Sequence, residues 1–352
     1  MQEFNQQMTN RLDEMLQNAE RPAIITHMKP DGDALGSSMG MYHFLRMSGK
    51  TGTVVLPHRP PATIDFLISA EDRQHIVIHE DAPTEAESAI AGSDLIICLD
   101  FNAFHRTDKL EKSLELSAAP KVLIDHHLNP DKDKFDLIFS ETEVSSTSEL
   151  LFHILMSMPQ IGNDASHLPE RTAESLMTGM ITDTNNFGNS VFPSTLRMAS
   201  ALLAAGTDRD RILSNLYNRF SENRLRLLGH MLKDLLKITD DGVAYMILDR
   251  GSLRRYNVME GDTEGFVNMP LSIADVRMSI LAKEDNDRIR ISIRSKKGTS
   301  ANRCARAYFN GGGHENAAGG RLTIPEDIRG IDEVGEYIER TTHTFLNDET
   351  HI

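Results

Sequence analysis

Acidic and imidazole side chains gather in one short stretch of the sequence, KVLIDHHLNP, residues 121–130. Asp125, His126 and His127 follow directly on an apolar run. A carboxylate and two imidazoles in succession can be ordinary loop residues. They can also be part of a metal site, because Asp and His supply oxygen and nitrogen ligands to divalent cations. The tripeptide alone leaves both interpretations open, so the other ionisable residues of the chain matter.

Further Asp and His residues follow other apolar segments in the same manner. HMKPDGD comes after PAIIT (22–26), and an aspartate ends both SDLIICLD and MTGMITD. Taken singly, an Asp at such a place is usually a turn residue or a helix N-cap, and two adjacent histidines usually lie in a surface loop. Taken together, they predict a metal site. The candidate ligands and their neighbours are His27, Asp31, Asp33, Asp100, Asp125, His126, His127 and Asp183.

The spacing in the first of these loops favours more than one cation. His27 and Asp31 are four residues apart, Asp33 is two further on, and Pro30 and Gly32 bend the chain between them. A tight turn there can aim two carboxylates at two nearby points. Two divalent cations about 3.5–4 Å apart need such ligands, with one carboxylate between them. Imidazole and carboxylate without thiolate favour Mn²⁺, Mg²⁺ or Fe²⁺ over structural zinc.

The elements that must position these residues alternate between strand and helix. Continuous apolar runs such as DLIICL are typical of strands buried on both faces of a parallel sheet. We therefore expect an α/β class domain with a doubly wound parallel sheet, whose ligands collect at the carboxyl ends of the strands. Strands are expected at 22–26, 51–57, 75–79, 93–100, 121–124 and 135–141, and helices near 34–49, 145–158 and 169–183.

The pattern changes in the second half of the chain. Residues 194–237 have wholly helical spacing, and a β-hairpin is expected around a charged turn at Glu284–Asp287. TSANRCARAYFN then predicts a helix capped by Thr299 or Ser300. We expect three parts: a catalytic metal-binding domain at 1–207, a helical connector at 208–237, and a smaller α+β domain at 238–347.

The smaller domain contains GGGHENAAGG (311–320), preceded by ISIRSKKG. A glycine run is often only a flexible loop, and a single Arg is often part of a solvated strand face. However, glycines let backbone N–H groups approach an anion closely, and Arg makes bidentate contacts with phosphate. The pattern predicts a phosphate-binding site. Its candidate residues are Arg294, Asn302, Gly312, Gly313 and His314.

The composition narrows the class of protein. The chain has 352 residues, a formal charge of −15 and two cysteines. Such acidity disfavours long duplex nucleic acid as a partner, although a local basic site for a short phosphorylated ligand is compatible with it. The cysteine count indicates no disulfide framework and favours a reducing cytoplasm. We expect no signal peptide and no membrane partner. The sequence does not reveal the oligomeric state, and a homodimer is compatible with it.

In its motifs the sequence resembles the DHH phosphoesterase superfamily with a DHH-associated carboxyl-terminal domain. The motifs are HMKPDGDALGS, ICLDFN, DHH, ITDTNNFG and GGGHENAAGG, in that order, and they span nearly the whole chain. The resemblance implies that His127 faces the substrate phosphate and that Asp125 orients a histidine. It implies two Mn²⁺ ions, one held by His27, Asp31 and Asp100 and the other by Asp33, Asp100, His126 and Asp183.

Within the superfamily, the chain is similar in length and motifs to the compact bacterial oligoribonuclease type. That resemblance implies hydrolysis of short RNA or DNA pieces to mononucleotides, and removal of the 3′-phosphate from adenosine 3′,5′-bisphosphate. A water activated by the metals would attack phosphorus, and the second domain would hold the far end of the nucleotide chain. Two alternatives stay open: hydrolysis of polyphosphate or pyrophosphate with the same metals, and a non-catalytic nucleotide-binding sensor.

Overall fold

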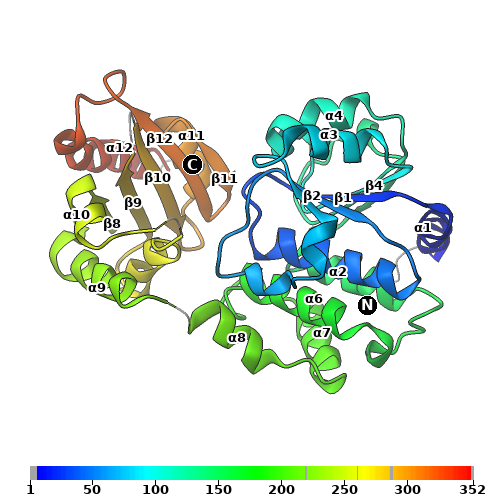
Figure 1. The fold of residues 1–352 in the computed structure, drawn as a ribbon. Helices are drawn as coiled ribbons and strands as arrows, with labels where there is room; N and C mark the ends of the chain where they lie inside the picture. The colour runs from blue at the N-terminus through cyan, green and yellow to red at the C-terminus, as the bar shows by residue number, and fades with distance from the viewer. Residues whose placement is uncertain (1–5, 219, 260, 286–287, 350–352) are drawn as a thin grey trace. The chain divides into compact units, whose positions relative to one another are not determined.

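The computed structural model describes residues 6–218, 220–259, 261–285 and 288–349. The chain forms two compact units, Met1–Arg219 and Phe220–Ile352. Each unit contains a six-stranded sheet, and the colours of Figure 1 separate the blue-to-green first unit from the yellow-to-red second unit.

The sheet of the first unit is parallel throughout, with the strand order β3-β2-β1-β4-β5-β6. Strands β1, β2 and β3 follow one another across the sheet in one direction. The chain then returns to the other side of β1, where β4, β5 and β6 follow one another in the opposite direction. The carboxyl ends of β1 and β4 therefore form the switch point at which doubly wound sheets bind ligands. The strands are β1 (Pro22–Ile25), β2 (Thr53–Leu56), β3 (Ile76–Ile78), β4 (Leu95–Leu99), β5 (Lys121–Asp125) and β6 (Leu137–Ser140).

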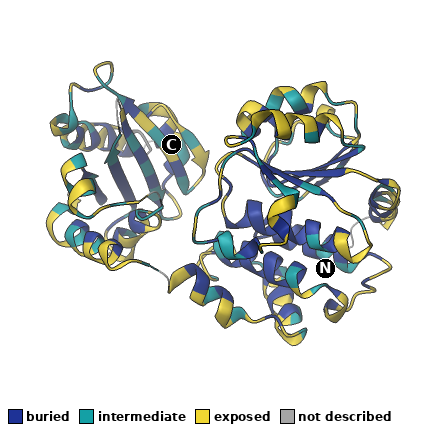
Figure 2. Ribbon diagram, in the orientation of Figure 1, coloured by how far each residue is buried: buried dark blue, intermediate teal, exposed yellow. Residues whose placement is uncertain are grey.

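Helices cover both faces of this sheet, which confirms the predicted doubly wound α/β fold. Strands β1, β4 and β5 are buried along their whole length, and Figure 2 shows them in dark blue between the two layers. One core lies under α2, α5 and α6, and a second lies under α3 and α4. The helices are α1 (Gln6–Asn18), α2 (Gly32–Met47), α3 (Pro83–Ala91), α4 (Glu111–Leu116), α5 (Thr147–Met156), α6 (Glu170–Asp183), α7 (Pro193–Ala204) and α8 (Arg209–Tyr217).

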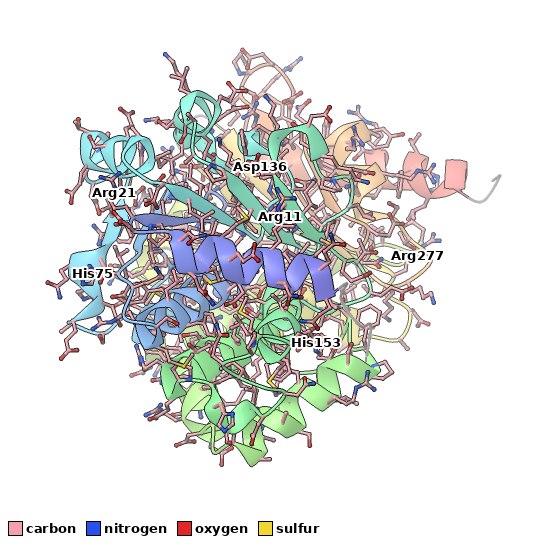
Figure 3. All side chains as sticks on the ribbon, turned by 90° about the vertical axis from the view of Figure 1, so that its right-hand side faces the viewer. Arg11, Arg21, His75, Asp136, His153 and Arg277 are labelled. Atoms are coloured by element: carbon pink, nitrogen blue, oxygen red, sulfur yellow. The ribbon has the colours of Figure 1, made fainter. Side chains whose placement is uncertain are left out.

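The described part of the chain begins with the amphipathic helix α1. It buries Leu12 and Leu16 against the first core and turns Arg11 to solvent, and it lies nearest the viewer in Figure 3. Within the described ranges, no helix combines the length and the apolar character needed to cross a membrane.

Glycines allow helices α2 and α6 to approach closely. A Cβ atom on Gly36 of α2 would lie 2.6 Å from the carbonyl oxygen of Ser175 in α6. A Cβ on Gly179 of α6 would lie 2.0 Å from Oγ of Ser148 and 2.8 Å from Oδ1 of Asp33. Any larger residue at these two positions would separate the helices. The close approach brings the start of α2 next to the start of α5 and the end of α6.

The sheet of the second unit has the order β11-β12-β10-β9-β8-β7 and is antiparallel except for β8 and β9. One face packs against α11 and α12, and α9 covers part of the other face. This is the smaller α+β domain that the sequence predicts. Its elements are α9 (Glu222–His230), β7 (Lys237–Ile238), β8 (Val243–Leu248), α10 (Arg250–Arg255), β9 (Met278–Glu284), β10 (Arg288–Ser295), α11 (Ala301–Tyr308), β11 (Gly312–His314), β12 (Ala317–Thr323) and α12 (Val334–Glu349).

Two local predictions in the second half of the chain are confirmed. Strands β9 and β10 form the expected antiparallel pair, although residues 286–287 of its predicted turn lie outside the described residues. Ser300 is the N-cap of α11, and its hydroxyl accepts a hydrogen bond from the backbone N–H of Arg303.

The prediction of continuous helical structure over 194–237 is wrong in detail. Three α-helices, α7, α8 and α9, are followed by a π-helical turn at Met231–Leu235, and Lys237 belongs to β7. Asp208 and Ser221 cap new helices with their side chains, which restarts the helix where apolar spacing alone suggests continuation. Helix α8 belongs to the first unit and α9 to the second, so the two units divide the predicted connector.

Candidate metal centre

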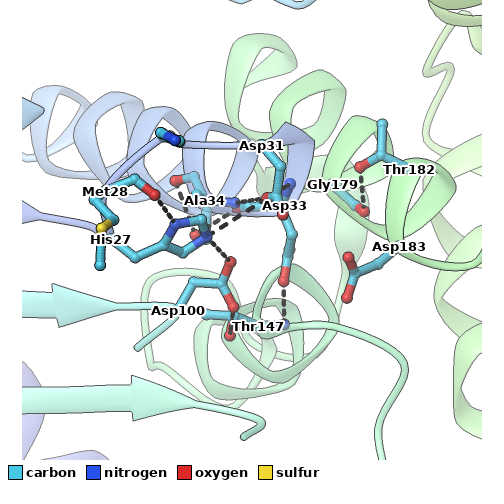
Figure 4. A network of polar contacts seen from close by, with 12 residues as sticks. His27, Met28, Asp31, Asp33, Ala34, Asp100, Thr147, Gly179, Thr182 and Asp183 are labelled. Carbon is cyan, nitrogen blue, oxygen red and sulfur yellow. Dashed lines mark hydrogen bonds and ion pairs between the residues drawn. The ribbon is translucent and has the colours of Figure 1, made fainter. Parts of the chain in front are cut away.

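Three neighbouring strands of the first unit deliver ionisable side chains to the switch point. His27 lies just beyond β1, Asp100 directly follows β4, and Asp125 ends β5 with His126 and His127 after it. These strands are adjacent in the order β1-β4-β5, so their carboxyl ends meet at one edge of the sheet. Helices α2 and α6 add the remaining predicted ligands to this edge (Figure 4). These are Asp31, Asp33 and Asp183.

A first group of donor atoms consists of His27, Asp31 and Asp100, whose ligand atoms all lie within 4.8 Å of one another. Nε2 of His27 lies 3.3 Å from Oδ2 of Asp100 and 3.8 Å from Oδ1 of Asp31. Nδ1 of His27 donates a hydrogen bond to the carbonyl oxygen of Met28 at 2.8 Å. Because a carbonyl can only accept, Nδ1 donates this bond, and Nε2 is the ring nitrogen that faces the carboxylates.

A second group consists of Asp33, His126 and Asp183, with ligand atoms again within 4.8 Å of one another. Nε2 of His126 lies 3.4 Å from Oδ2 of Asp183 and 3.6 Å from Oδ1 of Asp100. Asp100 therefore lies against histidines of both groups, through one carboxylate oxygen each. This is the arrangement expected of a carboxylate shared by two cations.

The electrostatics of the cluster fit a cation. Within the described part of the chain, the ion pairs of the cluster carboxylates are with histidines alone. Burial and the charge of Asp100 raise the pKa of Asp33, and burial and the charge of Asp33 raise the pKa of Asp183. Burial lowers the pKa of His27, but its hydrogen bond with Asp100 and the charge of Asp31 raise it to about 9 on balance. The raised pKa values of Asp33, Asp183 and His27 all show that the cluster favours additional positive charge.

The three residues of the DHH tripeptide have different surroundings. Nδ1 of His127 donates to Oδ1 of Asp125 at 2.7 Å, and Asp125 is completely buried. Asp125 therefore orients His127 rather than His126. His127 also lies near the cluster, because its Nδ1 is 3.7 Å from Oδ1 of Asp100. The geometry places His126 and His127 together with Asp100, and their separate roles stay predictions.

Helix α5 holds two of the carboxylates, which sequence reasoning missed. The backbone N–H groups of Thr147 and Ser148 donate to Oδ2 and Oδ1 of Asp33 at 2.7 and 2.8 Å. The hydroxyl of Thr147 donates to Oδ1 of Asp100 at 3.0 Å. Free N–H groups and the helix dipole make an N-terminus a natural partner for a carboxylate. In the sequence, Ser146 followed three residues later by Glu149 is a pattern typical of a helix N-terminus, and it could have indicated the start of α5.

Local backbone structure also fixes two predicted ligands. Asp31 is the N-cap of α2, and its Oδ1 accepts hydrogen bonds from the N–H groups of Asp33 and Ala34 at 3.1 Å each. Asp100 has a φ angle of 65°, a left-handed conformation that a non-glycine residue adopts at some cost. Residues held in such conformations are concentrated at functional sites.

The substrate-binding residues predicted in the second unit lie at one corner of its sheet. Arg294 of β10 and His314 of β11 both pair with Ala317 of β12, so they share one rung of the sheet. The side-chain amide of Asn302 donates to the carbonyl oxygen of Gly313. The structure thus brings together Arg294, Asn302, Gly312, Gly313 and His314.

The glycines of GGGHENAAGG have a packing role in addition to the predicted one. A Cβ on Gly311 would lie 1.9 Å from the carbonyl oxygen of Gly319, and one on Gly313 would lie 2.6 Å from that of Ala317. These glycines let β11 lie close against β12. A Cβ on Gly312 would meet only Cγ of Arg306, at 3.8 Å.

Comparison with known proteins agrees with both units. The profile of the DHH family, N-terminal domain, matches residues 22–180, and that of the DHHA1 domain matches residues 228–339. The bifunctional oligoribonuclease and PAP phosphatase NrnA of Bacillus subtilis is 26% identical over 84% of this chain and 87% of its own length. The protein of the same name from Thermus thermophilus is 27% identical over 88% of this chain and 86% of its own.

Among solved structures, an exopolyphosphatase-related protein from Bacteroides fragilis matches with a TM-score of 0.91. It is 34% identical to this chain, and the match covers 99% of both chains. With the two matched domains in the same order, this similarity shows that the chain belongs to the DHH family of phosphoesterases.

Proposed function

We propose that this protein hydrolyses short oligonucleotides to mononucleotides and also removes the 3′-phosphate from adenosine 3′,5′-bisphosphate. The observation that carries the proposal is the cluster of carboxylates and histidines at the switch point of the first sheet. The relatives from Bacillus subtilis and Thermus thermophilus, which match over most of the chain, are named for both activities.

The two groups of donor atoms support a pair of divalent cations, for which we propose Mn²⁺, with Mg²⁺ or Fe²⁺ as chemically similar substitutes. When bound, such a pair neutralises phosphate oxygens and lowers the pKa of a water molecule that attacks phosphorus. One cation would be held by His27, Asp31 and Asp100. The other would be held by Asp33, Asp100, His126 and Asp183.

The protein's own groups keep these ligands in place. The N-terminus of α5 holds both oxygens of Asp33, and Thr147 holds one oxygen of Asp100. The bond from Nδ1 of His27 to Met28 keeps Nε2 directed at the site. Partners of this kind hold metal ligands in the orientation that binding requires.

We assign to His127 the contact with the reacting phosphate. Its Nδ1 donates to Asp125, and Nε2 is the ring nitrogen that would donate to a phosphoryl oxygen or pass a proton to the leaving oxygen. Asp125 acts through His127, because complete burial leaves it no contact with substrate.

The second unit, in this proposal, holds the remainder of the nucleotide chain. Nη1 of Arg294 donates to the carbonyl oxygen of Ile293 at 2.9 Å, and burial lowers the pKa of the guanidinium. Its other N–H groups are available to a phosphate, and His314 on the same rung can add a further contact. Asn302 supports the glycine strand through Gly313.

The proposed ligands are short, and the proposed compartment is the cytoplasm. A formal charge of −15 opposes broad contact with duplex phosphates. Cys98 and Cys304 are both buried and form no disulfide, which is compatible with a reducing compartment.

A substrate panel tests the proposal. The panel contains pApA, adenosine 3′,5′-bisphosphate, longer oligonucleotides, pyrophosphate and polyphosphate, each with Mn²⁺ and with Mg²⁺. We expect mononucleotides from pApA and AMP from the bisphosphate. Phosphate release from polyphosphate alone would instead support the polyphosphatase alternative. Nucleotide binding by calorimetry with no turnover of any substrate would support a sensor.

A further inference from the structure

One face of the second sheet is left largely uncovered over β10 and β12. Ile289, Ile291 and Ile293 of β10 point into the core with α11 and α12, so the alternate residues of the strand face the other side. On that side, α9 and the short helix at Phe266–Ser272 pack over β8 and β9, and the short helix also reaches part of β10. The residues that β10 and β12 present there are partly or fully exposed.

Three basic residues on this face lie in direct register across three strands. Arg290 of β10 pairs with Lys283 of β9 on one side and with Arg321 of β12 on the other. We refer to Lys283, Arg290 and Arg321 as the basic row. Like charges that are directly opposite on neighbouring strands destabilise a sheet. The direct opposition of Arg290 and Arg321 therefore costs stability, and an anion over the two guanidiniums would relieve it.

The nearby carboxylates are engaged with other arginines. Asp285 pairs with Arg288 at 3.6 Å, and Glu284 lies 3.8 Å from Arg250. Among the residues that the structure describes, no carboxylate pairs with the guanidinium of Arg290 or Arg321. Both guanidiniums thus keep their donors for a ligand.

The basic row is separated from the predicted phosphate site by small residues. Arg294 follows Arg290 by four positions on the same face, which is about 13 Å along the strand. Ser292 and its cross-strand partner Gly319 lie between them. Gly319 has no side chain, so a ligand that extends along β10 can lie close to the sheet from one arginine to the other.

We propose that the basic row binds a second phosphate of the nucleotide chain whose other phosphate is held at Arg294. The identity of the ligand as a nucleotide chain rests on the proposed function. The row itself rests on the register of the three basic residues and on the absence, among the described residues, of carboxylate partners for Arg290 and Arg321. A ligand with one phosphate reaches only Arg294, whereas a ligand with several phosphates reaches both places.

Calorimetric titrations in EDTA, which prevents turnover, test this with AMP and with pApApA. The variants are the double substitution R290A/R321A and, as a matched control, R329A, whose side chain is 90% exposed and lies 3.9 Å from Glu333. We expect the double variant to bind pApApA about tenfold more weakly and AMP as the wild type does. The salt dependence of log Kd for pApApA should fall by about 0.7 for the lost phosphate contact.

Unchanged pApApA binding, or an equal loss for AMP and pApApA, would overturn the proposal. A thermal melt checks folding, and the double variant should melt no lower than the wild type because it removes repulsion. If the wild type binds neither nucleotide, the proposed function fails separately. Orthophosphate and a linear polyphosphate long enough to span the distance of about 13 Å between Arg294 and Arg290 then replace the two probes. Selective loss of polyphosphate binding by the double variant would uphold the row. Equal binding by both proteins, or no binding at all, rejects it.

Discussion

At the scale of single residues, Asp100 is subject to more constraints than any other predicted ligand. Its backbone has a left-handed φ angle at the end of β4, and its carboxylate accepts a hydrogen bond from the hydroxyl of Thr147. The carboxylate also lies against His27 and His126. Burial raises its pKa, but the hydrogen bond from His27 and the charges of three histidines hold it far below the usual range on balance. Asp100 therefore stays ionised, as a shared metal ligand must.

Thr147 offers a test of how much this support matters. Thr147→Val removes the hydroxyl bond to Asp100 but keeps the backbone N–H that holds Asp33. We expect kcat/KM to fall about 10- to 100-fold together with Mn²⁺ affinity, as is usual when a partner of a metal ligand is lost. Thr147→Ser keeps a hydroxyl and should retain most of the activity. Equal activities of the two variants would show that the bond is dispensable.

Glu149 makes the stability of the first unit depend on pH. Its buried carboxylate accepts hydrogen bonds from the N–H and hydroxyl of Ser145 and from the hydroxyl of Thr195. Burial raises its pKa, but the bonds from His153 and Ser145 lower it from 4.5 to about 2 on balance. Because the folded-state pKa is depressed, the stabilisation is complete above pH 4.5 and is lost as the pH falls towards 2.

Urea unfolding of the wild type and Glu149→Gln over that pH range measures the effect. We expect the variant to be less stable at pH 7 by about 1–3 kcal/mol, because buried donors lose a charged partner. The difference should shrink below pH 4.5. A difference that stays constant down to pH 2 would show that the carboxylate does not titrate in this way.

The types of the candidate ligands could be predicted from the sequence, but their supports could not. Asp and His at strand ends are visible as residue types, and the structure brings all of the predicted candidates in the first unit together. Thr147 and Ser148 hold Asp33 through backbone N–H groups. Ser146 and Glu149 indicate the helix start that presents these groups, but they do not reveal which carboxylate the groups meet. The pairing of Asp125 with His127 rather than His126 depends on side-chain direction at the end of β5.

At the scale of elements, the site depends on the close approach of α2 and α6. Gly36→Ala should lower the free energy of unfolding by about 1–3 kcal/mol, because the new Cβ would lie 2.6 Å from the carbonyl oxygen of Ser175. The shift of α2 should also weaken Mn²⁺ binding through Asp33. Chemical denaturation and metal titration measure the two effects.

Gly229 of α9 is the matched control, because a Cβ there would meet no atom within 4 Å. Gly229→Ala should leave stability unchanged or raise it slightly, since alanine is the better helix former. If both variants were equally stable, the close contact between α2 and α6 would not be limiting.

The strands of the first unit were predictable because long apolar runs are typical of a buried parallel sheet. Their spatial order was not, since β1 and β4 are neighbours only through the return of the chain after β3. The breaks between α7, α8 and α9 were missed because the apolar spacing continues past Asp208 and Ser221. The side chains of these two residues cap new helices, so the helix is interrupted although the spacing is not. Local hydrogen bonding outweighed periodicity there.

At the scale of the whole molecule, each unit has its own core, and the candidate metal ligands all belong to the first unit. Mn²⁺ should therefore raise the melting temperature, because it binds the folded state alone. The stabilisation should be about 2.7 kcal/mol at a concentration 100 times the Kd. Calorimetry with Mn²⁺ and with EDTA measures it, and Asp100→Asn should show a much smaller shift. Identical shifts in both proteins would place the cations elsewhere.

The central claim is that the switch-point cluster hydrolyses short nucleotide chains with bound metal. The most direct measurement is the release of AMP from pApA over time with Mn²⁺, by wild type and by Asp100→Asn of equal thermal stability. We predict release by the wild type that EDTA stops and Mn²⁺ restores, and at least about 100-fold slower release by the variant. Release at similar rates by both proteins, or none from wild type that binds Mn²⁺, would contradict the account.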